Sequence, residues 1–139
     1  MGGAMKAIYL AGPINGCADE ECMGWRAKAR QLLEGQFDIY DPLDRDFRGC
    51  EAIYAEAIVN TDLHAIAACD FLLVNASRPS WGTAMEVVRA WDSGKGVVAF
   101  SDAEAPSPWL TVHTHAIVKS LEAAVVFVMN FDAMARSRT

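Results

Sequence analysis

The sequence predicts an α/β protein built on one parallel sheet with helices on both faces. Short apolar runs alternate with helical patterns along the chain, and no linker, internal repeat or low-complexity stretch interrupts them. Five strand–helix alternations predict parallel strands joined by helical crossovers. The length of 139 residues suffices for one compact domain but not for two ordinary ones. We therefore expect a single domain over residues 1–139, in which residues 1–4 resemble an expression remnant.

Five apolar runs have the length and composition of buried strands. The run Asp70–Asn75 is the clearest, because it is apolar on both faces, as strands of parallel sheets are. Turn-forming pairs end the first two runs, Gly12-Pro13 after one and Asp41-Pro42 after the other. The predicted strands are Ala7–Ala11, Phe37–Tyr40, Asp70–Asn75, Gly96–Phe100 and Ala116–Val118.

Helical patterns fill the intervals between these strands. Ser107 and Pro108 favour a helix start, with serine as the N-cap and proline at the first helical position. From Leu121 to Met129, apolar residues recur at i, i+3, i+4, i+7 and i+8, which is one face of a helix. The other predicted helices span Asp19–Leu33, Glu51–Ala68 and Gly82–Trp91.

The topology of such a sheet is restricted by the right-handed crossover rule. We expect the flavodoxin-like, doubly wound five-stranded order 2-1-3-4-5, in which ligands bind at the carboxyl ends of the strands. Polar and turn-forming residues gather after the first three strands, at residues 12–16, 41–44 and 75–80. The functional site is therefore expected at this edge, although the fold alone names no reaction.

The amino-acid composition restricts the kinds of molecule that the protein can bind. The formal net charge of −6 argues against a nucleic-acid polymer, whose binding needs a basic face. A small anion remains possible, since a helix N-terminus can bind a phosphate. No apolar run approaches the roughly 18–20 residues that span a bilayer, and no charged-then-apolar leader opens the chain, so we expect a cytoplasmic protein. The cysteines lack close metal-type spacing and are expected as reduced thiols; they are Cys17, Cys22, Cys50 and Cys69.

Glu86 is the main candidate nucleophile. It follows the third predicted strand at the start of a helix, where its side chain would point back toward the strand ends. The helix dipole favours its ionised form. An ionised glutamate beside a sugar can attack the anomeric carbon in a retaining glycosyl transfer. The alternative is an acidic residue that only stabilises the helix start.

Other acidic residues are candidates for proton transfer or base contacts. Asp62 could protonate a departing base if burial or the charge of Glu86 raised its pKa, or it could be a solvated aspartate near a helix end. Carboxylates in the loop 40–49 could accept hydrogen bonds from a base, or could only close Asx turns. Asp70, at the amino end of its strand, is expected to be structural.

Several common motifs are missing from the sequence. There is no Gly-x-Gly-x-x-Gly dinucleotide fingerprint, no Walker-type Gly-Lys-Ser/Thr and no Gly-x-Ser-x-Gly elbow. His113 and His115 are two residues apart without a Cys or Glu partner, so no metal site is expected. Asn75 stands where a response-regulator receiver carries its phosphorylated aspartate, which disfavours that class.

Five segments together resemble the nucleoside 2-deoxyribosyltransferase family. They recur in the order and spacing of that family over about residues 6–128, nearly the whole chain. Each is weak alone, but five in register make a specific match. The segments are Ile8–Pro13, Asp41–Asp44, Asn60–Asp62, Asp70–Val74 and Gly82–Glu86.

The resemblance implies an enzyme without metal or organic cofactor that moves deoxyribose between bases through a covalent ester on Glu86. It implies Asp62 as the acid near the base and Tyr9 as the residue that orients the nucleophile. Further substrate contacts are expected from Gly12, Asn15, Gly16, Asp46, Ser80, Trp81, Gly82 and His113, with Asp46 near the base. A homodimer or larger homo-oligomer is implied, in which residues 109–115 of a neighbouring subunit complete each site.

Ser80 departs from the pattern of this family. Classical transferases carry an aspartate six residues before the nucleophile, at the sugar hydroxyls. The related 2'-deoxynucleoside 5'-monophosphate N-glycosidases have serine there, at the 5'-phosphate, where a carboxylate would repel the ligand. Hydrolysis of a nucleotide, with Ser77 and Arg78 assisting, is therefore the alternative to base exchange. A nucleotide-sensing module that binds without turnover is a third hypothesis, from another class.

Overall fold

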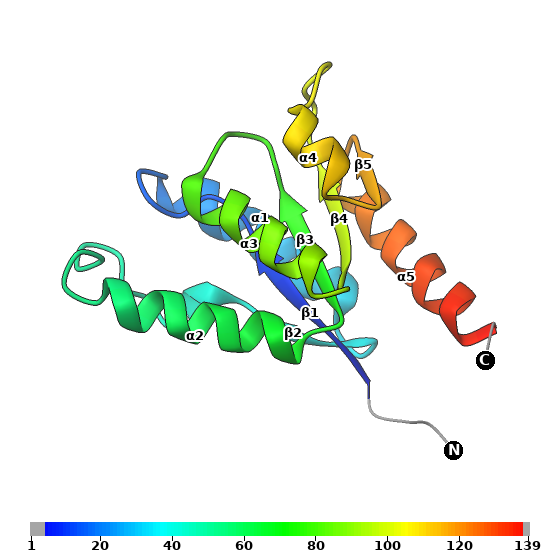
Figure 1. The fold of residues 1–139 in the computed structure, drawn as a ribbon, viewed down its shortest axis with the longest axis horizontal. Helices are drawn as coiled ribbons and strands as arrows, with labels where there is room; N and C mark the ends of the chain where they lie inside the picture. The colour runs from blue at the N-terminus through cyan, green and yellow to red at the C-terminus, as the bar shows by residue number, and fades with distance from the viewer. Residues whose placement is uncertain (1–4, 138–139) are drawn as a thin grey trace.

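The computed structural model describes residues 5–137 and confirms the predicted doubly wound α/β fold. All strand pairs are parallel, and the sheet has the order β2-β1-β3-β4-β5 (Figure 1). This is the flavodoxin-like order that the sequence predicts. The strands are β1 (Lys6–Ala11), β2 (Phe37–Tyr40), β3 (Phe71–Asn75), β4 (Gly96–Phe100) and β5 (Ala116–Val118).

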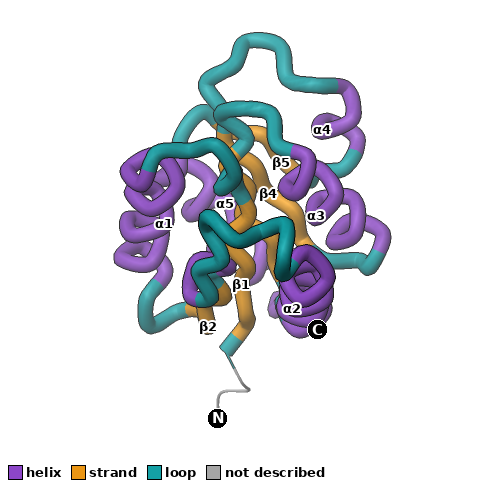
Figure 2. The backbone as a smooth tube through the Cα atoms, turned by 90° about the vertical axis from the view of Figure 1, so that its left-hand side faces the viewer, coloured by secondary structure: helices purple, strands orange, loops and turns teal. Residues whose placement is uncertain are grey.

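Helices cover both faces of the sheet, with α1 on one side and α2 and α3 on the other (Figure 2). Helix α5 packs against α1, whereas Leu110 of α4 packs on the α2–α3 side. No helix among residues 5–137 is long and apolar enough to cross a bilayer. The helices are α1 (Asp19–Leu33), the 3-10 helix η1 (Pro42–Asp44), α2 (Ala55–Ala68), α3 (Trp81–Asp92), α4 (Pro108–Val112) and α5 (Leu121–Ser137).

Two predicted boundaries shift because side chains close local turns. Helix α2 begins at Ala55 rather than Glu51, since the Glu51 carboxylate accepts a hydrogen bond from the backbone of Gly49 at 2.7 Å and closes a turn. Strand β3 begins one residue after Asp70, whose carboxylate accepts the backbone N–H of Ala7 at 2.9 Å. Asp70 thus ties the starts of β1 and β3 together, as the structural role predicts.

The alternation of β1 sends side chains into two separate cores. Ile8 and Leu10 pack on the α1–α5 side, whereas Ala7, Tyr9 and Ala11 face α2 and α3. Tyr9 is 1 % exposed and brings a hydroxyl into an otherwise apolar layer. The polar end of this side chain lies where the functional site forms.

Helix α2 is only loosely attached to the rest of the domain. Ile66 is its one fully buried residue, and the amino-terminal half is largely exposed. Ala55 and Ile58 in that half line a cavity instead of packing into the core. The helix therefore forms one wall of the site.

Candidate active site

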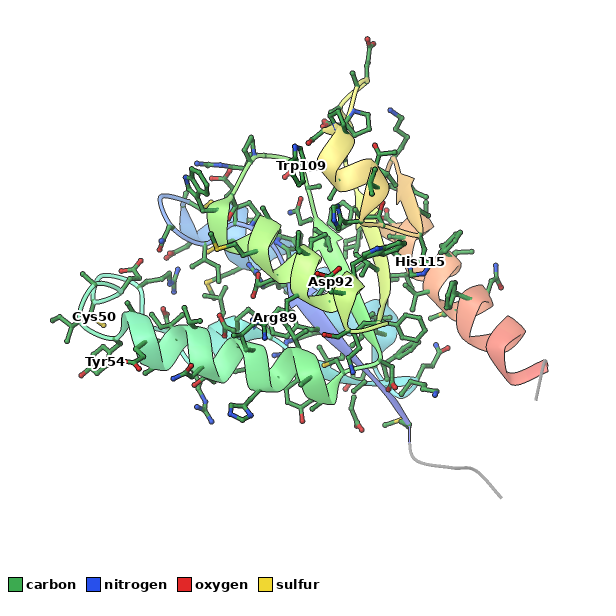
Figure 3. All side chains as sticks on the ribbon, viewed as in Figure 1. Cys50, Tyr54, Arg89, Asp92, Trp109 and His115 are labelled. Atoms are coloured by element: carbon green, nitrogen blue, oxygen red, sulfur yellow. The ribbon has the colours of Figure 1, made fainter. Side chains whose placement is uncertain are left out.

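A cavity of about 940 Å³ opens at the carboxyl ends of β1 and β2, beside α2 and α3. Its volume falls within the range of roughly 300–1,000 Å³ that small-molecule sites occupy. Tyr9 and Gly12 line it from β1 and the following turn, Asp62 from α2, and Ser80 and Glu86 from the cap and body of α3. Arg89, one turn beyond Glu86, also lines it and lies on the α2 side of α3 (Figure 3).

Tyr9, Asp62 and Glu86 form a single cluster although they come from three different elements. The Tyr9 hydroxyl donates a short hydrogen bond to Oε2 of Glu86, and Asp62 lies close enough for its charge to raise the pKa of Tyr9 and of Glu86. The phenol and the two carboxyls therefore interact electrostatically within one small volume.

Burial raises the pKa of both carboxyls in the cluster. The pKa of Glu86 rises to about 7; the hydrogen bond from Tyr9 and the charge of Arg26 oppose the rise, and the charge of Asp62 adds to it. Burial raises the pKa of Asp62 to about 6, again against Tyr9 and Arg26. Burial and the two carboxylates also raise the pKa of Tyr9, so the phenol stays protonated. Near neutral pH the two carboxyls therefore hold a proton between them.

The ionised Glu86 expected from the helix dipole is not what the geometry favours. Glu86 is the sixth residue of α3, which starts at Trp81, so it lies beyond the first turn where the dipole acts. Desolvation consequently outweighs the dipole. The free site starts partly protonated, and the reaction requires the proton to leave Glu86.

The start of α3 presents hydroxyl groups and backbone N–H groups to the cavity. Ser80 is the N-cap, and its hydroxyl accepts the backbone N–H of Thr83 at 3.4 Å. Gly82 has open space where a Cβ would lie. The Thr83 hydroxyl is buried and has no partner among the described residues. These groups match what an anion or a sugar hydroxyl requires.

Gly12 and Asn15, two of the predicted contacts, also line the cavity. A Cβ at Gly12 would come within 2.7 Å of the Trp25 ring, so no larger residue fits without displacing that ring. Gly16 lies just outside the lining and has a φ of 73°, which glycine adopts at low cost.

Asp46, Trp81 and His113 lie outside the cavity lining. The Asp46 carboxylate binds Arg48 through two hydrogen bonds of 2.8 and 2.6 Å, which lower its pKa to about 2, and Arg48 lines the cavity in its place. Trp81 is 85 % exposed. His113, the C-cap of α4, stacks on Trp109, and neither residue lines the cavity. Substrate contacts by these three residues stay predictions.

Arg26 is a residue of the site that the sequence analysis does not identify. It is 1 % exposed, and its guanidinium donates to the backbone oxygens of Cys22 at 2.7 Å and Gly12 at 3.1 Å. Its Nε lies 3.4 Å from a carboxylate oxygen of Asp41. A signal was available, because position 26 falls on the buried face of α1 defined by Cys22, Ala29 and Leu33.

Among the side chains of residues 5–131, no group of three or more His, Cys, Asp or Glu is arranged to hold a metal ion. The groups that line the cavity are instead suited to acid–base and nucleophilic chemistry on a small polar ligand.

The fold and the cavity define a flavodoxin-like protein whose site joins two carboxyls and a tyrosine at the carboxyl edge of the sheet. Residues 8–133 match the family model described as nucleoside 2-deoxyribosyltransferase, so the chain belongs to this family. It is a family of enzymes that act on nucleosides or nucleotides. No curated protein sequence matches the chain significantly.

Solved structures share the fold at low sequence identity. A 2-desoxiribosyltransferase from Leishmania mexicana is 24 % identical, with a TM-score of 0.68 over 88 % of this chain and 95 % of the other. A 2-deoxyribosyltransferase from Bacillus psychrosaccharolyticus is 23 % identical, with a TM-score of 0.67 over 84 % and 88 %. The CMP N-glycosidase BcmB from Clostridium botulinum is 19 % identical, with a TM-score of 0.60 over 90 % and 99 %.

Proposed function

We propose that this enzyme transfers deoxyribose between bases, with Glu86 as the nucleophile of a retaining reaction. The observation that carries the proposal is the cluster of Tyr9, Asp62 and Glu86 in the cavity. Family membership supports the reaction class, and the two 2-deoxyribosyltransferase structures support the fold on which it occurs.

The first half of the proposed reaction breaks the N-glycosidic bond. An oxygen of ionised Glu86 bonds to C1' of the sugar while the bond from C1' to the base nitrogen breaks, and Asp62 gives its proton to the departing base. Tyr9 holds Glu86 in line through its hydrogen bond. In the second half, a nitrogen of another base attacks C1', the ester bond to Glu86 breaks, and Asp62 recovers a proton from the incoming base.

The test is to incubate the protein with deoxynucleosides, with and without a second free base, and to separate the products by chromatography. We expect a new nucleoside only when the second base is present, and a protein mass increased by one deoxyribosyl group when it is absent. Glu86→Ala should lose at least about 1,000-fold in rate and never show the added mass. Native-rate exchange by this variant would overturn the proposal. Binding without turnover in the wild type would favour a sensing module.

A second candidate is the hydrolysis of a 2'-deoxynucleoside or nucleoside 5'-monophosphate by the same first half-reaction. It is favoured by the start of α3, where the Ser80 hydroxyl, the open space at Gly82 and the Thr83 hydroxyl, which has no partner among the described residues, meet the cavity. Such a surface fits a phosphate. Free base released from monophosphates regardless of any acceptor base would favour hydrolysis over exchange.

We also propose that a second copy of the chain covers the outer surface of α3 and α4, forming a homodimer or a larger homo-oligomer. Four apolar side chains on these helices are 64–85 % exposed in the single chain: Trp81, Met85, Trp109 and Val112. Large exposed apolar side chains on adjacent elements are typical of protein interfaces. In such an assembly, Trp81 and His113 would reach a neighbouring site rather than their own.

A further inference from the structure

The charge balance of the cluster requires a cation that the proposed mechanism does not use. Tyr9 faces Glu86 from β1 and Asp62 faces it from α2, so two acids and a phenol surround the same small volume. On α3 itself, Arg89 lines the cavity, but it is exposed to solvent. Without a buried counter-charge, desolvation would keep both carboxyls neutral.

Arg26 supplies a buried cation behind Gly12 and Asp41, which line the cavity. The guanidinium comes from α1, which packs on the other face of the sheet, and reaches the carboxyl end of β1 at Gly12. It is 1 % exposed and lies 4.7 Å from the centre of the Trp25 ring, so water does not screen it. Burial lowers the pKa of Arg26, and the carboxylates of Asp41 and Glu86 oppose that shift.

The contacts of Arg26 also explain why a guanidinium is needed there. One nitrogen binds the backbone oxygen of Cys22, the second binds that of Gly12, and Nε faces Asp41, the N-cap of η1. A planar guanidinium can bind two backbone oxygens in fixed directions while its charge faces a carboxylate, whereas a lysine ammonium is a single point of charge. The turns after β1 and β2 are therefore joined beneath the cavity.

We infer that Arg26 is a positioning residue of the reaction: from beneath the cavity it compensates the negative charge of Glu86 and Asp62 and fixes the floor formed by Gly12 and Asp41. This inference rests on the proposed function, in which Glu86 must be ionised when it attacks the sugar. Arg26 need not touch the substrate for this role. It acts through the groups that do.

The test is the pH profile of kcat/KM for the wild type, Arg26→Met and Arg26→Lys. The charge of Arg26 lowers the pKa of Glu86 and of Asp62, so its removal should move both limbs of the profile to higher pH, by about one pH unit. At pH 6 this corresponds to roughly a fivefold loss of kcat/KM. Arg26→Lys should keep both limbs near their wild-type positions while kcat falls.

Arg30→Met is the matched control on the same helix. Arg30 also contacts Asp41, at 3.5 Å, but its side chain is 40 % exposed and it does not contribute to the pKa of Glu86. We expect both limbs of the Arg30→Met pH profile to coincide with those of the wild type. Unmoved limbs in Arg26→Met, with the wild type active, would overturn the inference and leave the proposed function intact.

If Arg26→Met does not fold, a second pair of variants tests the same inference. Asp41→Asn keeps an oxygen for the backbone N–H of Leu43, now accepted at 2.9 Å, and removes the buried carboxylate that Arg26 would leave behind. The shift of the pH-profile limbs between Asp41→Asn and the double variant Asp41→Asn/Arg26→Met then reports the effect of the Arg26 charge. Carbon-13 NMR titration of the Glu86 carboxyl in the same proteins needs no substrate. An unmoved titration there overturns the inference even if no activity is found.

Discussion

Tyr9 is the residue on which the chemistry of the cluster depends most directly, because its one proton is donated to Glu86. Tyr9→Phe should keep the packing of the ring and remove that donor. Since the hydrogen bond lowers the pKa of Glu86, its loss should raise this pKa further. We expect kcat/KM to fall about 10- to 100-fold and the acid limb of its pH profile to move to higher pH. A variant with an unmoved acid limb and native kcat/KM would contradict this role.

Glu86 should also leave a signature in the pH dependence of stability. Its pKa is raised from 4.5 to about 7 on folding, so the native state binds more protons than the unfolded state between these values. The stability that this proton confers is complete below pH 4.5 and is lost as pH rises toward 7. In Glu86→Gln, which cannot titrate at this position, this loss of stability with rising pH should not occur.

Urea unfolding of the wild type and Glu86→Gln at pH 5 and pH 8 tests this linkage. The free energy of unfolding of the variant, relative to that of the wild type, should increase by about 2 kcal/mol between the two pH values. An equal difference at both pH values would show that Glu86 is not desolvated as the geometry indicates.

At the scale of elements, the start of α3 combines capping with ligand recognition. Ser80→Asp keeps a capping oxygen, since aspartate is as good an N-cap as serine, but it adds a negative charge to the cavity. We expect little change in stability. Turnover of a 5'-monophosphate should fall about 10- to 100-fold through charge repulsion, while turnover of the free nucleoside should hold or rise.

Ser80→Ala separates the two roles of this residue. It removes the cap without adding charge, and because the present hydrogen bond is long at 3.4 Å, the free energy of unfolding should fall by only about 0.5 kcal/mol. Equal losses on nucleoside and monophosphate in both Ser80 variants would exclude a phosphate contact at this cap.

Elements with strong local signals were predictable from the sequence. The five strands follow from apolar runs, and crossover handedness leaves few orders, among which the flavodoxin-like one is found. The start of α2 was missed because the Glu51 side chain closes a turn with Gly49, a contact that a helical pattern does not reveal. Arg26 was missed because burial of an arginine depends on acceptors from two distant turns, which only the tertiary fold brings together.

The candidate site was likewise predictable from the sequence only in part. Tyr9, Asp62 and Glu86 lie on segments whose order resembles a known family, and they do meet in the cavity. Their protonation could not be read from local position, since burial outweighs the helix dipole at Glu86. The family resemblance implies Asp46 as a base contact, but Arg48, two residues away, binds its carboxylate.

At the scale of the whole molecule, the two faces of the sheet differ in how completely they are covered. The α1–α5 side holds a continuous core, whereas on the other side α2 encloses a cavity and α3 and α4 expose two tryptophans. Because Trp81 and Trp109 stabilise little within the single chain, they can be changed without cost to the fold. This makes the proposed association testable separately from folding.

Trp81→Glu combined with Trp109→Glu should weaken self-association at least 100-fold, since buried tryptophans are among the strongest contributors to interfaces. Sedimentation velocity over a range of concentrations measures this, and the far-UV circular dichroism spectrum should not change. Val126→Glu is the matched control: Val126 is 57 % exposed, but on α5, which packs on the opposite face. If neighbouring subunits complete the sites, activity per chain should fall with dissociation in the tryptophan variant alone. Full activity in a dissociated variant would mean that each chain carries a complete site.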